Sequence, residues 1–296
     1  MFQIPILLIT FNRPDHVRQA LTEIRKQQPQ KLFVFQDGIR KERILDEGKV
    51  LEIREIVCEL VDWPCELFLN YQNTNLGCGR GPYEAMSWFF QNVEMGIILE
   101  DDVVPHPLFF TYMQELLERY KDNHQVGMVT GHNLQRYYSR HNSYYFTHEM
   151  FGTLGWGTWR RVWQKFDFHI PYQEEELRSS LESYGLSSLV IQHLCKQYKK
   201  WLTGSRHDCW DYQFDYYLMV NNYLNARPNS CLTSHEGDDA DATHTGFTNP
   251  RYKMEVNESR FNPINHPISV KVDISVRFRM FKKEVHLLIK QLLRRQ

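Results

Sequence analysis

Hydrophobic residues follow two different spacings in the first 130 residues of the chain. Residues 4–10 form a continuous apolar run, typical of a strand buried on both faces, and Val17, Leu21 and Ile24 follow at helical spacing. The same alternation continues down to residue 130. It predicts strands at 4–10, 31–35, 66–69, 96–99 and 126–130, and helices that begin near residue 14 and lie at 41–61, 83–91 and about 109–120.

Strands that alternate with helices at this spacing indicate βαβ units and a mostly parallel sheet flanked by helices. In such α/β sheets, ligands bind beyond the carboxyl ends of the strands. Four segments follow strand ends here, and we expect them to converge in space: 10–13, 36–38, 75–81 and 100–102.

The second half of the chain is less regular. It contains an aromatic turn region at 151–163, helical stretches near 174–202 and 208–223, and a polar loop at 234–250. Without internal repeats or a long linker, a single α/β domain with an elaborated C-terminal half is the economical interpretation, at 1–267. Residues 268–296 form a basic amphipathic tail that either packs on its own protein or lies on an anionic membrane surface.

Composition narrows the class of protein. The 35 Lys and Arg residues balance 36 Asp and Glu residues, so no nucleic-acid partner is indicated. No apolar run has the roughly 18 residues of a membrane span, and the apolar N-terminus lacks the basic segment of a signal peptide. The six cysteines form no CxxC pair or zinc-ligand spacing, so we expect reduced thiols in a cytoplasmic protein.

An acidic triplet, Glu100-Asp101-Asp102, directly follows the apolar strand at 96–99. Three carboxylates at the end of a buried strand repel one another unless a cation neutralises them. Oxygen ligands suit Mg²⁺ or Mn²⁺, which bind diphosphates through one or two protein carboxylates. The alternative is a solvated acidic turn before the helix that begins near Pro107.

Two further acidic features are candidates for chemistry. Asp211 follows Trp210 at the start of an aromatic helix, where partial desolvation beside an indole would favour a proton acceptor. The alternative is an ordinary acid in the first turn of a helix. The polar loop gathers acids and a histidine that would bind a metal or phosphate, or would simply be solvated: Asp238, Asp239, Asp241 and His244.

A glycine-rich stretch at 73–82 is predicted to be a loop before the helix at 83–91. Gly77, Gly79 and Gly81 would let the backbone approach a ligand closely. The stretch lacks the GKS/T ending of a P-loop and is a poor dinucleotide fingerprint. Arg80 in this stretch, and Arg13 after the first strand, would each face phosphate or uracil, or be solvated.

Several segments together resemble one enzyme class. PILLITFNRP, FVFQDG, NLGCGRGP, IILEDDVVPHPLFFTYMQELLERY, GTLGWGTWRRVW, CWDYQFDYYL and DATHTGF have the order and spacing of nucleotide-sugar glycosyltransferases with the GT-A fold. The sequence is most similar to the β-1,2-N-acetylglucosaminyltransferases of N-glycan branching and their bacterial relatives, over residues 4–247.

The resemblance implies a role for individual residues. Asp102 would contact the Mn²⁺ (or Mg²⁺) that holds the UDP diphosphate, and Asp211 would be the catalytic base. Arg13 and Asp37 would contact the uracil. The remaining donor-site residues would be Thr10, Gly79, Arg80, Glu100, Asp101, Trp156 and His244.

The sequence also departs from the pattern of the N-glycan enzymes. They carry two acids after the Trp, where this chain has Asp211-Tyr212, so a neighbour of Asp211 is an alternative base. No N-terminal membrane anchor is evident, which favours a cytoplasmic, bacterial-type enzyme of surface-glycan synthesis, with peripheral contact to the inner membrane through the tail as a further expectation.

The resemblance therefore implies a Rossmann-like GT-A domain with a nucleotide-binding half at 1–130 and an acceptor-side half at 131–267. Its expected activity is inverting, metal-dependent transfer of a sugar, GlcNAc being favoured, from a UDP-sugar to a hydroxyl of a glycan or glycolipid. Two alternatives stay open: a metal-dependent sugar nucleotidyltransferase, and a sugar-binding module without catalysis.

Overall fold

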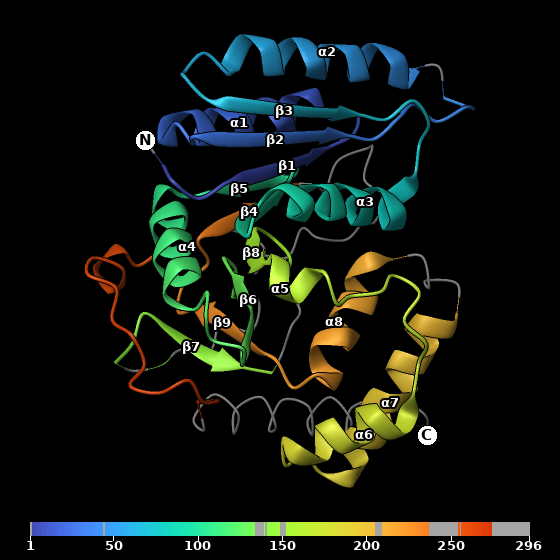
Figure 1. Cartoon of the computed structure of the whole chain (residues 1–296), viewed down its shortest axis with the longest axis vertical. Helices are drawn as coiled ribbons and strands as arrows, with labels where there is room; N and C mark the ends of the chain where they lie inside the picture. The colour runs from blue at the N-terminus through green and yellow to red at the C-terminus, as the bar shows by residue number, and fades with distance from the viewer. Residues whose placement is uncertain are drawn as a thin grey trace, which may run out of the picture.

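An eight-stranded mixed sheet forms the centre of the described part of the chain, with the strand order β3-β2-β1-β4-β8-β6-β9-β7 (Figure 1). Six strands run in one direction, while β8 and β7 run antiparallel to their neighbours. In chain order the strands are β1 (Ile6–Thr10), β2 (Lys31–Gln36), β3 (Glu66–Tyr71), β4 (Met95–Glu100), β6 (Val126–Thr130), β7 (Tyr144–Thr147), β8 (Trp156–Trp159) and β9 (Leu224–Pro228).

A second, two-stranded sheet pairs β5 (Val103–Pro105) with β10 (Thr233–His235) in antiparallel register. The computed structural model describes residues 2–43, 45–133, 139, 141–148, 152–204, 209–236, 254 and 256–273. Residues 237–250 of the predicted polar loop, which include His244, and residues 274–296 of the predicted tail lie outside these ranges. No helix in the described ranges is long and apolar enough to cross a membrane.

Helices cover both faces of the sheet. In Figure 1, α3 (Gly77–Asn92) lies in front of the strands and α1 (Pro14–Gln27) lies behind them. The remaining helices are α2 (Leu45–Leu60), α4 (Pro107–Arg119), α5 (Arg160–Trp163), α6 (Glu174–Ser183), α7 (Ser188–Thr203) and α8 (Trp210–Val220), with a short 3₁₀ turn at Glu258–Arg260. The predicted mixed α/β fold with a mostly parallel, helix-flanked sheet is confirmed.

The apolar strands are buried because helices cover them on both sides. All five residues of β1 are buried, as their continuous apolar run predicts. On the α3 side, Phe33 of β2 stacks on Phe68 at 4.3 Å between ring centroids and meets Phe89 of α3 edge to face. The rigid sheet that results fixes the positions of the strand ends.

The helices α6, α7 and α8 build a second, smaller hydrophobic core at one end of the molecule (Figure 1). Leu177 and Leu181 of α6 meet Ile191 and Tyr198 of α7 and Tyr216 of α8 there. Helix α8 belongs to both cores, because Phe214 and Leu218 pack into the main one. It therefore connects the sheet to the helical unit.

Two predictions about local structure were wrong. Residues 77–82 are not loop but the first turns of α3, with Pro82 inside the helix. The aromatic turn region contains β8, inserted in the middle of the sheet. Gly157 permits this insertion, since a Cβ at that position would lie 3.0 Å from the Gly96 carbonyl oxygen.

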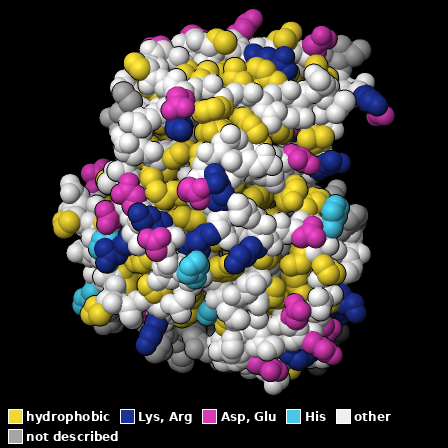
Figure 2. Space-filling model, viewed as in Figure 1, with side chains coloured by type: hydrophobic (Ala, Val, Ile, Leu, Met, Phe, Trp, Pro, Cys, Tyr) yellow, Lys and Arg dark blue, Asp and Glu magenta, His cyan; other side chains and the backbone are white. Residues whose placement is uncertain are grey.

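The surface carries both signs of charge. Figure 2 shows basic and acidic side chains interspersed on the face viewed, in keeping with the net charge of −1. This view therefore shows no extended face of one charge sign that would attract a polyanion.

Candidate active site

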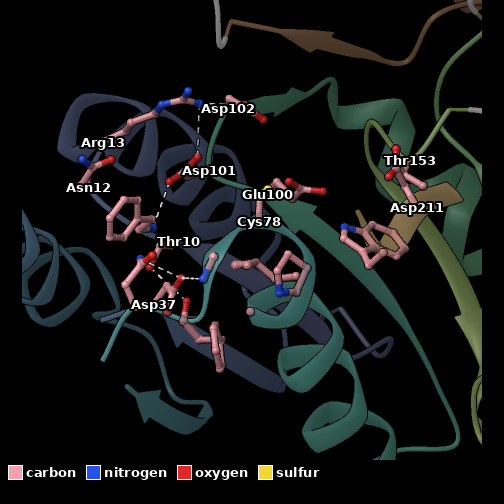
Figure 3. Close-up of a pocket in the computed structure, with 18 of the residues that line it drawn as sticks. Thr10, Asn12, Arg13, Asp37, Cys78, Glu100, Asp101, Asp102, Thr153 and Asp211 are labelled. Carbon is pink, nitrogen blue, oxygen red and sulfur yellow. Dashed lines mark hydrogen bonds and ion pairs between the residues drawn. The ribbon is translucent and has the colours of Figure 1, made fainter. Parts of the chain in front are cut away.

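The four strand-end segments meet in one cavity of about 500 Å³ (Figure 3). The prediction that they converge is confirmed. Thr10 and Asp37 lie on one side, and Thr153 and Asp211 lie together on the opposite side. The polar and charged lining residues include Thr10, Asn12, Arg13, Asp37, Arg40, Asn75, Glu100, Asp101, Asp102, Thr153, Asp211 and His235.

The acidic triplet turns out of β4 into the cavity and is tied to the loop after β1. The Arg13 Nη1 donates to Asp102 Oδ2 at 2.8 Å, and the Phe11 backbone N–H donates to Asp101 Oδ2 at 3.1 Å. Two loops that are far apart in the sequence are thus held together by charge and hydrogen bonding. The predicted contact residue Arg13 lines the cavity, but its guanidinium is engaged with a carboxylate.

The pKa values of Glu100 and Asp102 shift in opposite directions. Burial raises the pKa of Glu100 well above its ordinary value, and the charges of Asp102, Asp101 and Asp211 raise it further. Burial also acts on Asp102, but the hydrogen bond and charge of His235, together with Arg13, outweigh it and hold the pKa of Asp102 below its usual range. Because the charge of Asp211 raises the pKa of Glu100, the carboxyl group at the start of α8 lies near the end of β4.

His235 is a site residue that the sequence analysis missed. Its Nε2 lies 3.4 Å from Asp102 Oδ2. The antiparallel pairing of β10 with β5 places it opposite Val103, one residue after Asp102. Three-residue strands show no usable hydrophobic alternation, so the sequence offered only the presence of a histidine in the polar loop and indicated His244 instead.

The donor set fits a divalent cation bound partly by substrate. The carboxyl groups of Glu100, Asp101, Asp102 and Asp211 line the cavity together with Arg13 and His235, and oxygen ligands of this kind suit a divalent ion. Among the described residues, no three acids, histidines or cysteines form a complete protein cage. Mg²⁺ and Mn²⁺ need no such cage when phosphate oxygens and water complete their coordination.

Asp37 organises the beginning of α3. Its carboxylate accepts hydrogen bonds from the backbone N–H groups of Gly38 and Leu76 at 2.8 Å and Gly77 at 3.0 Å, and from the Asn75 side chain at 3.0 Å. Burial raises the pKa of Asp37, and these backbone hydrogen bonds partly offset the rise. Four donors fill the acceptor positions of a carboxylate, so Asp37 holds the cavity wall in place.

Glycines make this connection compact. A Cβ on Gly38 would lie 2.4 Å from the carbonyl carbon of Thr74, so only glycine fits there without displacing backbone. Gly77 has a φ of +83°, in the left-handed region that favours glycine. It begins α3 beside Asp37 and lines the cavity.

Arg40 is a second residue that the sequence did not reveal. Its Nε and Nη2 donate to the two oxygens of Asp46 at 2.7 and 2.8 Å, and its guanidinium lies over the Phe11 ring at 4.9 Å. Asn12 also donates to Asp46, at 2.8 Å. A planar cation held on two sides is well placed to face a base or a phosphate in the cavity.

The start of α8 forms the far wall. Asp211 lies in the first turn of the helix, and Trp210 beside it stacks on Trp156 of β8 at 5.7 Å. Trp156 is fully buried behind Trp210 and does not line the cavity. Tyr212, the neighbour considered as an alternative position for the base, stacks on Trp201 at 4.8 Å and is not among the cavity-lining residues.

Two other predicted contacts lie away from the cavity lining. Gly79 is buried inside α3, and the Arg80 Nε lies 3.3 Å from Glu84 Oε1 on an exposed face of that helix. The cause is that this stretch is helical, so its successive residues point in different directions. Thr10 does line the cavity, and its hydroxyl donates to the Phe35 carbonyl at 3.0 Å.

No model of a known protein family matches the sequence, and no curated protein matches it. Similar solved structures include a cytidylyltransferase from Leptospira borgpetersenii (13% identity, TM-score 0.34). The similarity covers 58% of this chain and 66% of the cytidylyltransferase chain, slightly less than two thirds of the length of that enzyme. Another is mouse xyloside xylosyltransferase 1 (11% identity, TM-score 0.38, 75% of this chain and 83% of that one). A third is the inositol-1-phosphate CTP transferase from T. maritima (8% identity, TM-score 0.33, 55% and 74%).

Proposed function

We propose that this chain is an inverting glycosyltransferase that moves a sugar, GlcNAc being favoured, from a UDP-sugar to a hydroxyl of a glycan or glycolipid. The observation that carries the proposal is the single cavity in which Asp211 of α8 faces the acidic triplet at the end of β4. Acidic groups on opposite walls suit a transfer reaction. Asp211 would accept the proton on one side of the sugar, and a metal ion on the triplet would stabilise the negative charge of the leaving diphosphate on the other.

Different walls of the cavity would bind the nucleoside and the sugar. The wall made by Phe11, Asp37, Arg40 and Asn75 would receive the nucleoside, since it offers an aromatic ring, a fixed cation and amide groups. Thr153, Trp210 and Asp211 would face the sugar and its acceptor. Aromatic and hydrogen-bonding groups side by side are typical of sugar contacts.

In the transfer step, the acceptor hydroxyl would give its proton to Asp211 while its oxygen forms the new bond to the anomeric carbon. The bond from that carbon to the diphosphate breaks, and the nucleoside diphosphate leaves with the bonding electrons. Arg13 and His235 would keep Asp102 ionised and oriented. Mn²⁺ or Mg²⁺ held by Asp102, with His235 beside it, would supply positive charge for the leaving diphosphate.

A thermal-shift panel tests this proposal. UDP, GDP, CDP and UTP would each be added with Mn²⁺ or with EDTA to the wild type and to Asp102→Asn. Ligand that binds only the native state at a hundredfold excess over Kd adds about 2.7 kcal/mol of stability, which shifts Tm measurably. We expect a shift for UDP that requires Mn²⁺ and weakens in Asp102→Asn.

Other results of the panel would point to the alternative functions. A sugar nucleotidyltransferase would bind UTP or CTP in preference to UDP, and would release pyrophosphate when given a sugar phosphate. A sugar-binding module would show no shift with any nucleotide. In either case the proposed transferase activity would be wrong.

A further inference from the structure

A second, smaller cavity of about 20 Å³ lies behind Asp211. Asp211 lines both this cavity and the main one, so it stands between them. Asp215 lies one helical turn further along α8 and lines the smaller cavity but not the main one. Thr153, like Asp211, lines both cavities. Residues four apart on a helix lie on the same face, so the two carboxylates are neighbours.

Asp215 is placed where a carboxylate is costly. It is 4% exposed, and helix α8 packs at this point against the apolar side chains of the second core. Its Oδ2 accepts a hydrogen bond from the hydroxyl of Tyr198, which is fully buried in α7. An apolar side chain would pack here without the desolvation penalty of a buried polar group, which points to a role for the carboxyl group.

The small cavity has the size and polarity to hold one water molecule. A cavity needs roughly 10–15 Å³ and two to four polar partners for a water to be favourable. Asp211, Asp215 and Thr153 bring polar side chains to its wall, while Met128, Phe214 and Leu218 close it on the apolar side. A water at this position would join the two carboxylates.

We propose that Asp215 is a positioning residue for Asp211 and acts through the cavity that the two share. Asp215 lies one helical turn from Asp211 on the same face, and a water held between them in the shared cavity would fix the orientation in which Asp211 points into the main cavity. Tyr198 fixes Asp215 by its hydrogen bond and so links the helical unit to the active site. This role rests on the proposed function, in which Asp211 accepts the proton of the acceptor.

The first test measures coupling without any assay of activity. Tm is determined for wild type, Asp211→Asn, Asp215→Asn and the double variant. The control pair combines Asp211→Asn with Glu182→Gln, a substitution on the exposed face of α6. We expect the two Tm shifts of Asp211→Asn and Asp215→Asn to deviate from additivity by about 2 °C or more, and those of the control pair to add. Additive shifts for both pairs would overturn the proposal.

The second test separates positioning from simple structural support. With a UDP-sugar that the wild type uses, Asp215→Asn should lower kcat about tenfold or more while the donor KM changes less than about twofold. Tyr198→Phe, which keeps the ring and removes only the hydroxyl, should lower kcat in the same way to a smaller extent. It also keeps the test decisive if Asp215→Asn folds poorly.

Failure of the positioning role and failure of the proposed function would give different results. An unchanged kcat in both variants, or a rise in donor KM without a fall in kcat, would overturn the positioning role while leaving the transferase proposal intact. A wild type that binds nucleotide but transfers no sugar would overturn the proposed function. The Tm cycle would then still show whether the two carboxylates are coupled.

Discussion

Arg13 Nη1 lies 2.8 Å from Asp102 Oδ2, which joins the loop after β1 to the turn after β4. The side chains of both residues are largely shielded, with 13% and 17% of their surfaces exposed. A charge pair of this kind orients the carboxylate at the point where the proposed function needs an ionised ligand. It also accounts for an arginine at the N-cap position of α1, where its side chain accepts no hydrogen bond from the helix backbone.

Replacing Arg13 should therefore cost more than replacing a surface arginine. Arg13→Met leaves Asp102 partly buried without this partner, and we expect the free energy of unfolding to fall by about 1–3 kcal/mol. Arg18→Met is the matched control, because its pair with Glu59 has 45% and 60% of the side-chain surfaces exposed. The control should lose less than about 1 kcal/mol in urea unfolding. Equal losses in the two variants would contradict the interpretation.

Gly38 and Gly48 offer a test of the wall built around Asp37. A Cβ on Gly38 would meet the Thr74 backbone at 2.4 Å, whereas a Cβ on Gly48 in α2 would meet nothing within 4 Å. We expect Gly38→Ala to lower stability by about 2–4 kcal/mol and to weaken nucleotide binding. Gly48→Ala should raise stability by about 0.5–1 kcal/mol. Thermal unfolding of both variants checks this contrast, which fails if Gly38→Ala is neutral.

Asp46 should make stability depend on pH in the acid range. The hydrogen bonds from Arg40 hold the pKa of Asp46 below its usual range, so the folded state binds fewer protons than the unfolded state. The stabilisation is complete above the unfolded value of about 3.9 and is lost as pH falls through the folded pKa. Between pH 6 and 3, Asp46→Asn should show a shallower fall in Tm than wild type. As a control, Asp15→Asn at an exposed position should give the same Tm curve as wild type. The prediction is wrong if Tm falls equally steeply in wild type, Asp46→Asn and Asp15→Asn.

Cys78 can report directly on occupancy of the cavity. It is exposed, it is the second residue of α3, and it lines the main cavity, whereas the exposed Cys58 lies on α2 away from it. UDP with Mn²⁺ should slow alkylation of Cys78 by a small thiol reagent several-fold and leave Cys58 unchanged. Peptide mass spectrometry measures both rates in one sample. Equal rates with and without ligand would place the nucleotide elsewhere.

The sequence predicted the half of the site that depends on strand ends. Thr10, Asp37 and the triplet from Glu100 follow long apolar runs, and parallel strands bring their carboxyl ends to one edge, so their meeting was foreseeable. Asp211 was reached from the Trp-Asp pair and the family resemblance, and α8 carries it to the cavity wall.

The remaining half depends on contacts that local patterns do not encode. His235 reaches Asp102 only because two three-residue strands pair, and β8 lies close to β4 because Gly157 has no side chain to meet the Gly96 carbonyl. Arg40 is held by Asp46, across the beginning of α2, and nothing in the spacing of the two residues marks that pair. Arg80 was assigned to a loop, and the helical conformation of that stretch turns it outward.

Sugar transfer by Asp211→Asn tests the central claim most directly. The measurement is release of UDP from a UDP-sugar in the presence of Mn²⁺ and an acceptor, together with the affinity for UDP, in wild type and variant. The account predicts that Asp211→Asn binds UDP as wild type does and loses transfer by about a hundredfold or more, because the asparagine cannot take the acceptor's proton. A variant that turns over at the wild-type rate would contradict it.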